Sequence, residues 1–188
     1  MSIQPAGTTV DYSITWLEMT ARPVWDWPRQ PLGLNGVLVR ADTPPAWYFL
    51  SLYDAVGRDY AWEDMHKEDE GALTAWLAQP EVGLWTLMAQ GWPQGFFLLD
   101  ARAAGVTNLG YFGLVPQVVG RGFGSFLLRT AVLTAWERSG LQKLTVNTCS
   151  LDHPRALSSY QKHGFNVVAQ EARSRVITRD RDPSRIPE

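Results

Sequence analysis

Residues 112–140 read FGLVPQVVGRGFGSFLLRTAVLTAWERSG, and this stretch decides how the rest of the chain is interpreted. Glycines stand at positions 120, 122 and 124, directly before an apolar stripe with helical spacing. Glycine loses more conformational freedom on folding than any other residue, and a tight turn needs only one or two. Three alternating glycines therefore indicate that bare main chain is required here, ahead of a helix that stops at Ser139-Gly140.

Two familiar phosphate-binding loops fit this stretch poorly. A P-loop closes with Gly-Lys-Ser/Thr, whereas Ser125 follows Gly124 with no lysine between them. A dinucleotide fingerprint needs G-x-G-x-x-G directly after a strand and an acidic residue ending the next strand. Here PQVV separates the loop from its strand, and the next strand carries Asn147 and Cys149.

The remaining interpretation is a concavity of main-chain N–H groups that binds a pyrophosphate at the helix N-terminus. Without side chains, the main chain can approach the phosphates directly. The simpler alternative is a glycine-rich turn that only serves helix–sheet packing. That alternative accounts for one glycine better than for three.

The whole chain has the size and charge of one globular domain. Its 188 residues suffice for a single core, and 17 basic against 19 acidic side chains give a net charge of −2. Because this balance provides no basic field for a phosphate backbone, we expect no nucleic-acid partner. A secretory signal pattern and a membrane-length apolar run are not seen, and the single Cys149 excludes an internal disulfide. We therefore expect a cytoplasmic protein without a membrane partner.

Hydrophobic periodicity predicts an α+β fold. The expected elements are strands at 10–20 and 36–41, helices at 43–57 and 68–80, strands at 84–90, 94–101 and 106–116, a helix from 123, a strand at 143–151, a helix capped by Asp152 or His153 and closed by Gly164, and one or two strands from 165. Short links make the middle strands an antiparallel meander, and two helical crossovers imply parallel neighbours in the C-terminal half. The result is a three-layer α/β/α arrangement, with a mixed, largely antiparallel central sheet and helices on both faces. Residues 1–175 would form one domain, and 176–188 a flexible tail.

Two segments together resemble the acetyl-CoA-binding core of the GNAT N-acetyltransferase family. They are FGLVPQVVGRGFGSFLL and, further on, NTCSLDHPRALSSYQKHGF, in the family's order and spacing, and the resemblance covers residues 84–168. It implies acetyl-CoA as the cosubstrate, with the pyrophosphate on the glycine loop and the pantetheine arm along the end of the preceding strand. The residues that the resemblance assigns to acetyl-CoA are Leu114, Val115, Val119, Gly120, Arg121, Gly122, Phe123, Gly124, Ser125, Asn147 and His153.

The chain departs from the family pattern at two of these positions. Val119 stands where the family's loop usually begins with Gln or Arg, which removes one side-chain contact and leaves the main-chain groups in place. His153 stands where many members carry an Asn that bonds the pantetheine arm. The imidazole either replaces that Asn or only caps the following helix.

Tyr160 matches the tyrosine of the family motif, here SYQKHGF, and would donate a proton to the departing CoA thiolate. A phenol with a pKa near 10 and a thiol near 8.5 differ by about 1.5 units, or about 2 kcal/mol. General acid catalysis of this kind contributes about 10²–10⁴-fold. The alternative is an aromatic side chain that anchors its helix.

The group that deprotonates the amine is harder to assign. An alkyl ammonium with a pKa near 10.4 is almost entirely protonated at pH 7. Asn108 stands where some members carry a glutamate on the central strand, and an amide cannot accept a full proton. The remaining candidates are Glu63, Asp64, Asp152 or a bound water, unless the acceptor has a low pKa. In this family the loop after the first helix usually shapes the acceptor site, which implies a substrate site formed by Tyr60, Trp62, Glu63 and Asn108. A solvated charged face with one packing tryptophan is the alternative.

The resulting hypothesis is direct transfer of an acetyl group from acetyl-CoA to a primary amine in one ternary complex. A small-molecule amine is preferred as the acceptor, and a protein lysine or N-terminus is the alternative. A non-catalytic acyl-CoA-binding module and a dinucleotide-binding module are the other classes. Cys149 is expected to be a small packed residue rather than a nucleophile, and the three histidines lack ligand spacing, so no metal is expected. The sequence does not decide the oligomeric state, and a homodimer is one of the possibilities.

Overall fold

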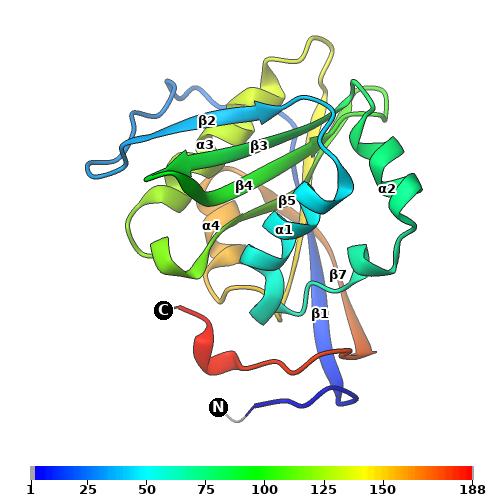
Figure 1. Ribbon diagram of the computed structural model, residues 1–188. Coiled ribbons are helices and arrows are strands. Elements are labelled where there is room, and N and C mark those ends of the chain that lie inside the picture. Colours follow the sequence, from blue (N-terminus) through cyan, green and yellow to red (C-terminus); the bar gives the residue numbers. More distant parts are fainter. Residues whose placement is uncertain (1–2, 188) are drawn as a thin grey trace.

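A mixed seven-stranded sheet organises the fold, in a computed structural model that describes residues 3–187 (Figure 1). The strand order is β2-β3-β4-β5-β6-β1-β7. The strands are β1 (Thr9–Met19), β2 (Gly36–Ala41), β3 (Val82–Ala89), β4 (Trp92–Asp100), β5 (Val106–Leu114), β6 (Lys143–Cys149) and β7 (Asn166–Val176). The helices are α1 (Ala46–Gly57), α2 (Glu70–Leu77), α3 (Phe123–Trp136) and α4 (Ala156–Lys162), and the 3₁₀ turns are η1 (Arg58–Tyr60), η2 (Asp64–Lys67), η3 (Pro116–Val118) and η4 (Pro183–Arg185). Among these residues no helix is long and apolar enough to cross a bilayer.

Helices cover both faces of the sheet. In Figure 1, α1 and α2 lie on the near side, and α3 and α4 lie on the far side. Neighbouring residues of β5 show the same division, because successive side chains of a strand point to opposite faces. Tyr111 packs against Phe49 of α1 with ring centroids 5.3 Å apart, and Phe112 packs against Tyr160 of α4 at 6.2 Å. The predicted α+β architecture is confirmed.

The middle of the sheet has the predicted connections. β3, β4 and β5 form an antiparallel meander, and β6 runs parallel to β5 after the crossover through α3. The apolar stripe predicted for α3 is its buried face, on which Leu127, Leu128 and Ala131 are fully buried. α3 ends at Trp136, before the predicted stop, and Gly140 forms a separate left-handed turn with φ +76°.

The second crossover differs from the prediction. β7 follows α4 but does not pair with β6, because β1 lies between them and pairs antiparallel with both. β1 takes the interior position because Thr15, Leu17 and Met19 are buried, whereas β7 is exposed along most of its length. Hydrophobic periodicity detects both strands but does not say which of them lies inside.

The start of α4 also differs from the prediction. Its cap position is Arg155, and neither Asp152 nor His153 caps it with a side chain. Pro154 therefore precedes the helix instead of standing in its first turn. Asp152 accepts a hydrogen bond from the N–H of Cys149 at 2.8 Å, which stabilises the turn after β6 instead of the helix.

The end of α4 is the predicted Schellman motif. Gly164 adopts φ +90°, and the N–H of Phe165 donates to the carbonyl of Tyr160 at 3.1 Å. The rings of Phe165 and Tyr160 also pack together, with centroids 5.8 Å apart. This ending fixes the position of Tyr160 on the sheet.

Residues 177–187 pack against the domain, where the sequence predicted a flexible tail; Glu188 lies outside the described residues. Ile177 is fully buried and Arg181 is 7% exposed. Gln4 and Arg181 donate their N–H groups to each other's carbonyl, both at 2.8 Å. The Arg181 guanidinium donates to the carbonyls of Asp59 and Leu151. Composition could not indicate this packing, because every partner lies far away in the sequence.

Candidate active site

A cleft in the sheet begins where β5 and β6 separate. Their parallel pairing covers three residue pairs and ends at Asn108 and Thr145. Beyond this point β5 continues to Leu114 and β6 to Cys149 without pairing with each other. The N–H and C=O groups on the two facing edges are therefore available to a ligand. A cavity of about 450 Å³ lies in this gap.

Five segments line the cavity: β5, β6, the glycine loop with the start of α3, the stretch from residue 152 to 163, and the stretch after α1. Most residues predicted for the site meet there, namely Leu114, Val119, Gly120, Gly124, Ser125, Asn147, His153, Tyr160, Tyr60 and Trp62. The predicted site residues that do not line the cavity are Val115, Arg121, Gly122, Phe123, Glu63 and Asn108.

The glycine loop owes its glycines to conformation rather than to packing. Gly120 and Gly122 have φ of +84° and +80°, and a Cβ at either position would meet nothing within 4 Å. Only glycine adopts this conformation without strain. Gly124 differs, because it lies in α3 with an ordinary φ, and its Cβ would lie 3.7 Å from Leu114. Helix–sheet packing therefore does not explain Gly120 and Gly122.

The loop presents a row of free main-chain donors. The N–H groups of Val118 and Val119 donate to carbonyls of the preceding turn, and that of Phe126 donates to the Gly122 carbonyl at 3.4 Å. Between them, the N–H groups of residues 120–125 have no acceptor among the described residues. A helix N-terminus with such donors attracts an anion.

His163 belongs to the same end of the cavity, and sequence reasoning did not single it out. Its Nε2 lies 3.0 Å from the Ser125 hydroxyl, and its Nδ1 lies 2.7 Å from the Ser159 carbonyl. Because a carbonyl only accepts, Nδ1 carries a proton. The neutral ring then accepts at Nε2 from Ser125. Its position one residue before the closing Gly164 was the signal available in the sequence.

Tyr160 lies on the α4 side of the cavity. It is 6% exposed, and its hydroxyl takes part in none of the hydrogen bonds between described residues. Burial, reinforced by the negative charge of Asp152, raises the pKa of Tyr160 above its usual value. The hydroxyl therefore remains protonated at neutral pH and is free to donate.

Asp152 supplies the carboxylate that lines the cavity. Its Oδ1 accepts from the indole Nε1 of Trp62 at 3.0 Å. Its Oδ2 accepts from the Thr148 hydroxyl at 2.7 Å and from the Cys149 N–H at 2.8 Å. These bonds fix a negative charge beside the aromatic residues at the end of the cavity away from the glycine loop.

A family model that matches the chain includes both the forked strands and the glycine loop. The model, described as Acetyltransferase (GNAT) family, matches residues 47–165, which is more than half of the chain and contains Tyr160. The chain belongs to the GNAT acetyltransferase family. A search of curated proteins found no match.

Solved structures of other GNAT proteins share the fold at low sequence identity. A GCN5-related N-acetyltransferase from Sphaerobacter thermophilus has a TM-score of 0.58 and 18% identity, with 94% of this chain and 53% of that chain covered. One from Kribbella flavida has a TM-score of 0.55 and 19% identity, with 91% and 58% covered. An aminoglycoside acetyltransferase from an uncultured soil metagenomic sample has a TM-score of 0.54 and 14% identity, with 68% and 86% covered. The chain spans 63%, 53% and 58% of the length of the first three similar structures, and the likeness is one of fold.

Three strands of this GNAT protein lie outside the family match. β1 and β2 precede it and β7 follows it. β1 and β7 pair along their length at one end of the sheet, and residues 177–187 continue from β7 towards the stretch after α1. The family match therefore does not describe this side of the GNAT domain.

Glu63 and Asp64 do not face the GNAT cavity, contrary to the expectation that they serve the acceptor site. The Glu63 carboxylate is 3% exposed and accepts from the N–H groups of Thr178, at 3.0 and 3.1 Å, and Arg179, at 3.3 Å. Asp64 pairs with Arg175, with the two oxygens at 2.8 and 3.1 Å from the guanidinium. The loop lies where the resemblance implied, but C-terminal partners turn both carboxylates away.

Asn108 lies at the apex of the fork, not in the cavity. Its Oδ1 accepts from the Thr145 hydroxyl at 3.1 Å, which ties the last paired residues of β5 and β6 together. Val115 and Phe123 are core residues, and the Val115 N–H donates to the Gln94 carbonyl at 3.0 Å. Neither residue lines the GNAT cavity, and their contact with the cosubstrate stays a prediction.

The two ring nitrogens of His153 have different hydrogen-bonding roles. Nδ1 accepts from the N–H of Arg155 at 3.1 Å, so the neutral ring carries its proton on Nε2. Nε2 is buried and has no hydrogen-bond partner among the described residues. Burial, and then the charge of Arg155, lowers the pKa of His153. The ring therefore stabilises the turn before α4 and is kept neutral.

Cys149 has the environment of a packed thiol. It is half-buried, and burial followed by the negative charge of Asp152 raises its pKa to about 11. A thiol with so high a pKa is a poor nucleophile at neutral pH, because the thiolate is the reactive form.

Proposed function

We propose that this GNAT protein transfers an acetyl group from acetyl-CoA to a small primary amine in a single ternary complex. The observation that supports it is the forked cleft, whose lining brings the loop with free N–H donors together with Asp152 and Tyr160. Both substrates would lie in one continuous cavity, and orientation would supply much of the rate.

The glycine loop fits the pyrophosphate of acetyl-CoA, which supplies the activated acetyl group. The N–H groups of residues 120–125 lack acceptors among the described residues, and space is open where Gly120 and Gly122 would carry a Cβ. Each charge-assisted hydrogen bond contributes about 1.5–3 kcal/mol. The Ser125 hydroxyl lies at this end of the cavity too, with its proton donated to His163, so the main-chain N–H groups are the donors that remain for the pyrophosphate. The pantetheine arm would lie along the unpaired edge of β5, where an N–H near Leu114 would polarise the thioester carbonyl.

Tyr160 would protonate the sulfur as the C–S bond breaks. Its raised pKa makes the phenol a weaker acid, but the proton acceptor would be held in the same surroundings. Burial and the charge of Asp152 raise the pKa of Tyr160, and we expect the same surroundings to raise the pKa of a CoA thiol held beside it. Because both pKa values would be raised together, the raised pKa of Tyr160 is compatible with general acid catalysis.

The other end of the cavity suits a small cationic amine. Asp152 provides one negative charge, and Tyr60, Trp62 and Tyr111 provide aromatic surface around it. A cation beside aromatic faces and a carboxylate gains from both contacts. A single fixed carboxylate favours a compact amine over a strongly basic peptide. A protein lysine or N-terminus remains the alternative acceptor.

A screen of primary amines with acetyl-CoA tests the proposal, with release of the CoA thiol as the measured signal. Tyr160→Phe is expected to lower kcat by about 10²–10⁴-fold, because the variant keeps the ring and loses the proton donor. Calorimetric affinity for CoA should stay unchanged. Tyr48→Phe is the matched control, since the Tyr48 hydroxyl bonds Thr86 outside the cavity. Equal turnover by Tyr160→Phe and the wild type would exclude the acid role.

The second candidate is an acyl-CoA-binding module without catalysis. It is favoured because Asn108 and Glu63, two positions where a base was sought, are engaged in bonds away from the cavity. Tight CoA binding without turnover of any amine in the screen would decide for this candidate.

A further inference from the structure

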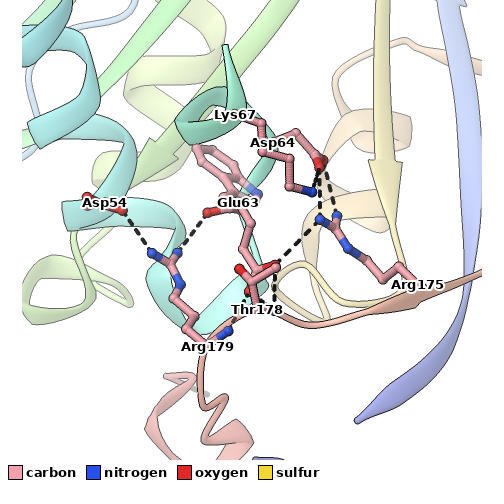
Figure 2. Close-up of polar contacts among 8 residues, drawn as sticks. Asp54, Glu63, Asp64, Lys67, Arg175, Thr178 and Arg179 are labelled. Carbon is pink, nitrogen blue, oxygen red and sulfur yellow. Dashed lines mark hydrogen bonds and ion pairs between the residues drawn. The ribbon is translucent and has the colours of Figure 1, made fainter. Parts of the chain in front are cut away.

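The C-terminal segment, residues 177–187, runs from β7 along the stretch that follows α1 (Figure 1). Its first residue is anchored in the domain, because Ile177 is fully buried and donates its N–H to the Thr8 carbonyl at 3.1 Å. The following residues make polar contacts with α1 and with the acceptor loop, which we define as residues 58–67 (Figure 2). The segment therefore lies where it can set the position of the acceptor loop.

The first of these contacts is a buried charge. The Glu63 carboxylate lies between the two chain segments and accepts three hydrogen bonds from the N–H groups of Thr178 and Arg179. A carboxylate that is only 3% exposed is costly unless such donors stabilise it. Glu63 consequently fastens the acceptor loop to the C-terminal segment.

The second contact is a guanidinium bridge. Arg179 donates from one nitrogen to Asp54 Oδ1 at 3.0 Å and from the other to the Trp62 carbonyl at 2.7 Å. Figure 2 shows the side chain reaching from the C-terminal segment to α1, which carries Asp54. Although burial opposes ionisation of Asp54, hydrogen bonds from His66 and Arg179 outweigh it and lower its pKa. The planar guanidinium holds the last turn of α1 and the main chain of Trp62 in one fixed relation.

Trp62 carries this constraint to the cavity. Its indole lines the cavity and donates from Nε1 to Asp152 at 3.0 Å. The ring packs at 5.3 Å from Tyr53 and 5.6 Å from Tyr111, and a Cβ at Gly57 would lie only 2.3 Å from it. Trp62 is thus held by Arg179 at its main chain and by Asp152 at its side chain.

We propose that Arg179 is a positioning residue for the amine: it acts through Trp62 to hold the acceptor side of the cavity, including Asp152, in place. The inference rests on the proposed function. Arg179 does not line the cavity itself, and the glycine loop belongs to another part of it. Loss of Arg179 should therefore weaken amine binding and leave CoA binding intact.

Steady-state kinetics of Arg179→Ala test the proposal with the best amine of the screen. We expect KM for the amine to rise about 10- to 100-fold, because small misplacements of a binding wall cost that much. The calorimetric affinity for CoA should not change. Arg179→Lys should recover part of the loss, since an ammonium can still pair with Asp54. Arg185→Ala is the matched control, because Arg185 lies on the same segment, is 62% exposed and only approaches Asp59 at 4.0 Å.

Hydrogen exchange followed by mass spectrometry gives a readout that does not depend on turnover. In Arg179→Ala we expect faster exchange across the acceptor loop, with no change in α3. This result supports the proposal even if no amine is acetylated, in which case the proposed function alone fails. Unchanged exchange in the acceptor loop overturns the proposal. An equal loss of affinity for the amine and for CoA also overturns the proposal, because that pattern indicates a general loss of stability. If Arg179→Ala does not fold, the kinetic and hydrogen-exchange measurements are made on Arg179→Lys and Glu63→Gln instead.

Discussion

Gly120, Gly122 and Gly124 are close in sequence but are glycines for different reasons. The first two adopt positive φ, so any side chain there strains the main chain even though space is open. Gly124 has no such constraint, because it is the second residue of α3 and faces the cavity. A substitution at Gly124 therefore tests the phosphate cradle without distorting the loop.

We expect Gly124→Val to weaken CoA binding by about tenfold or more, which corresponds to the loss of one charge-assisted hydrogen bond. Calorimetry with CoA measures this. Gly71→Val is the matched control, since Gly71 is the second residue of α2 and lies outside the cavity. Equal affinity of a folded Gly124→Val and the wild type would speak against pyrophosphate binding at this loop.

His153 makes stability depend on pH in a defined direction. Its folded pKa is below the ordinary 6.5, so below pH 6.5 the unfolded chain binds more protons than the folded one. The neutral ring therefore stabilises the fold above pH 6.5, and this contribution declines as the pH falls.

We expect the melting temperature to fall between pH 6.5 and about pH 5, and to fall less in His153→Asn. Asparagine retains an oxygen that can accept from the Arg155 N–H but does not titrate. Scanning calorimetry of both proteins across this range measures the difference. Parallel pH profiles would show that His153 is not responsible.

At the scale of the elements, the two strands from opposite ends of the chain have unequal roles. β1 lies between β6 and β7 and has two hydrogen-bonded neighbours, whereas β7 is an edge strand. Burial follows this difference, because Leu17 of β1 is 1% exposed and Val168 of β7 is 53% exposed. β1 should therefore contribute much more to stability than β7, although it lies outside the family match.

Leu17→Ala is expected to lower the free energy of unfolding by about 2–5 kcal/mol, since it leaves a cavity in the core. Val168→Ala on the exposed edge should change it by less than about 0.5 kcal/mol. Urea denaturation of both variants makes the comparison. Similar losses at the two positions would contradict an interior place for β1.

The sequence predicted which segments form strands and helices better than it predicted which strands pair with each other. Alternation and helical spacing located the meander, α3 and the Schellman end of α4, because these signals are local. Pairing of β1 between β6 and β7 joins residues more than a hundred positions apart, and no local pattern encodes it. Asp152 is likewise a residue type that often caps helices. Here its carboxylate instead accepts hydrogen bonds from the turn before the helix.

At the scale of the whole molecule, most cavity-lining residues of β5 and the glycine loop could be predicted, whereas those of the stretch after α1 could be predicted only in part. The first depends on a contiguous motif. The second depends on Glu63, Asp64 and Arg179, whose partners come from the other end of the chain. His163 was overlooked because its contact with Ser125 is made across two helices.

The two described ends of the chain also lie side by side. Gln4 and Arg181 exchange main-chain hydrogen bonds, and the Ala6 N–H donates to Asp180 at 2.9 Å. Any polypeptide joined before Gln4 or after Pro187 would consequently leave the domain close to the acceptor loop, whose Asp59 carbonyl accepts a hydrogen bond from Arg181. An affinity tag or a neighbouring module attached at either end would therefore sit beside the acceptor loop, and under the proposed function its length would affect which amines reach the cavity.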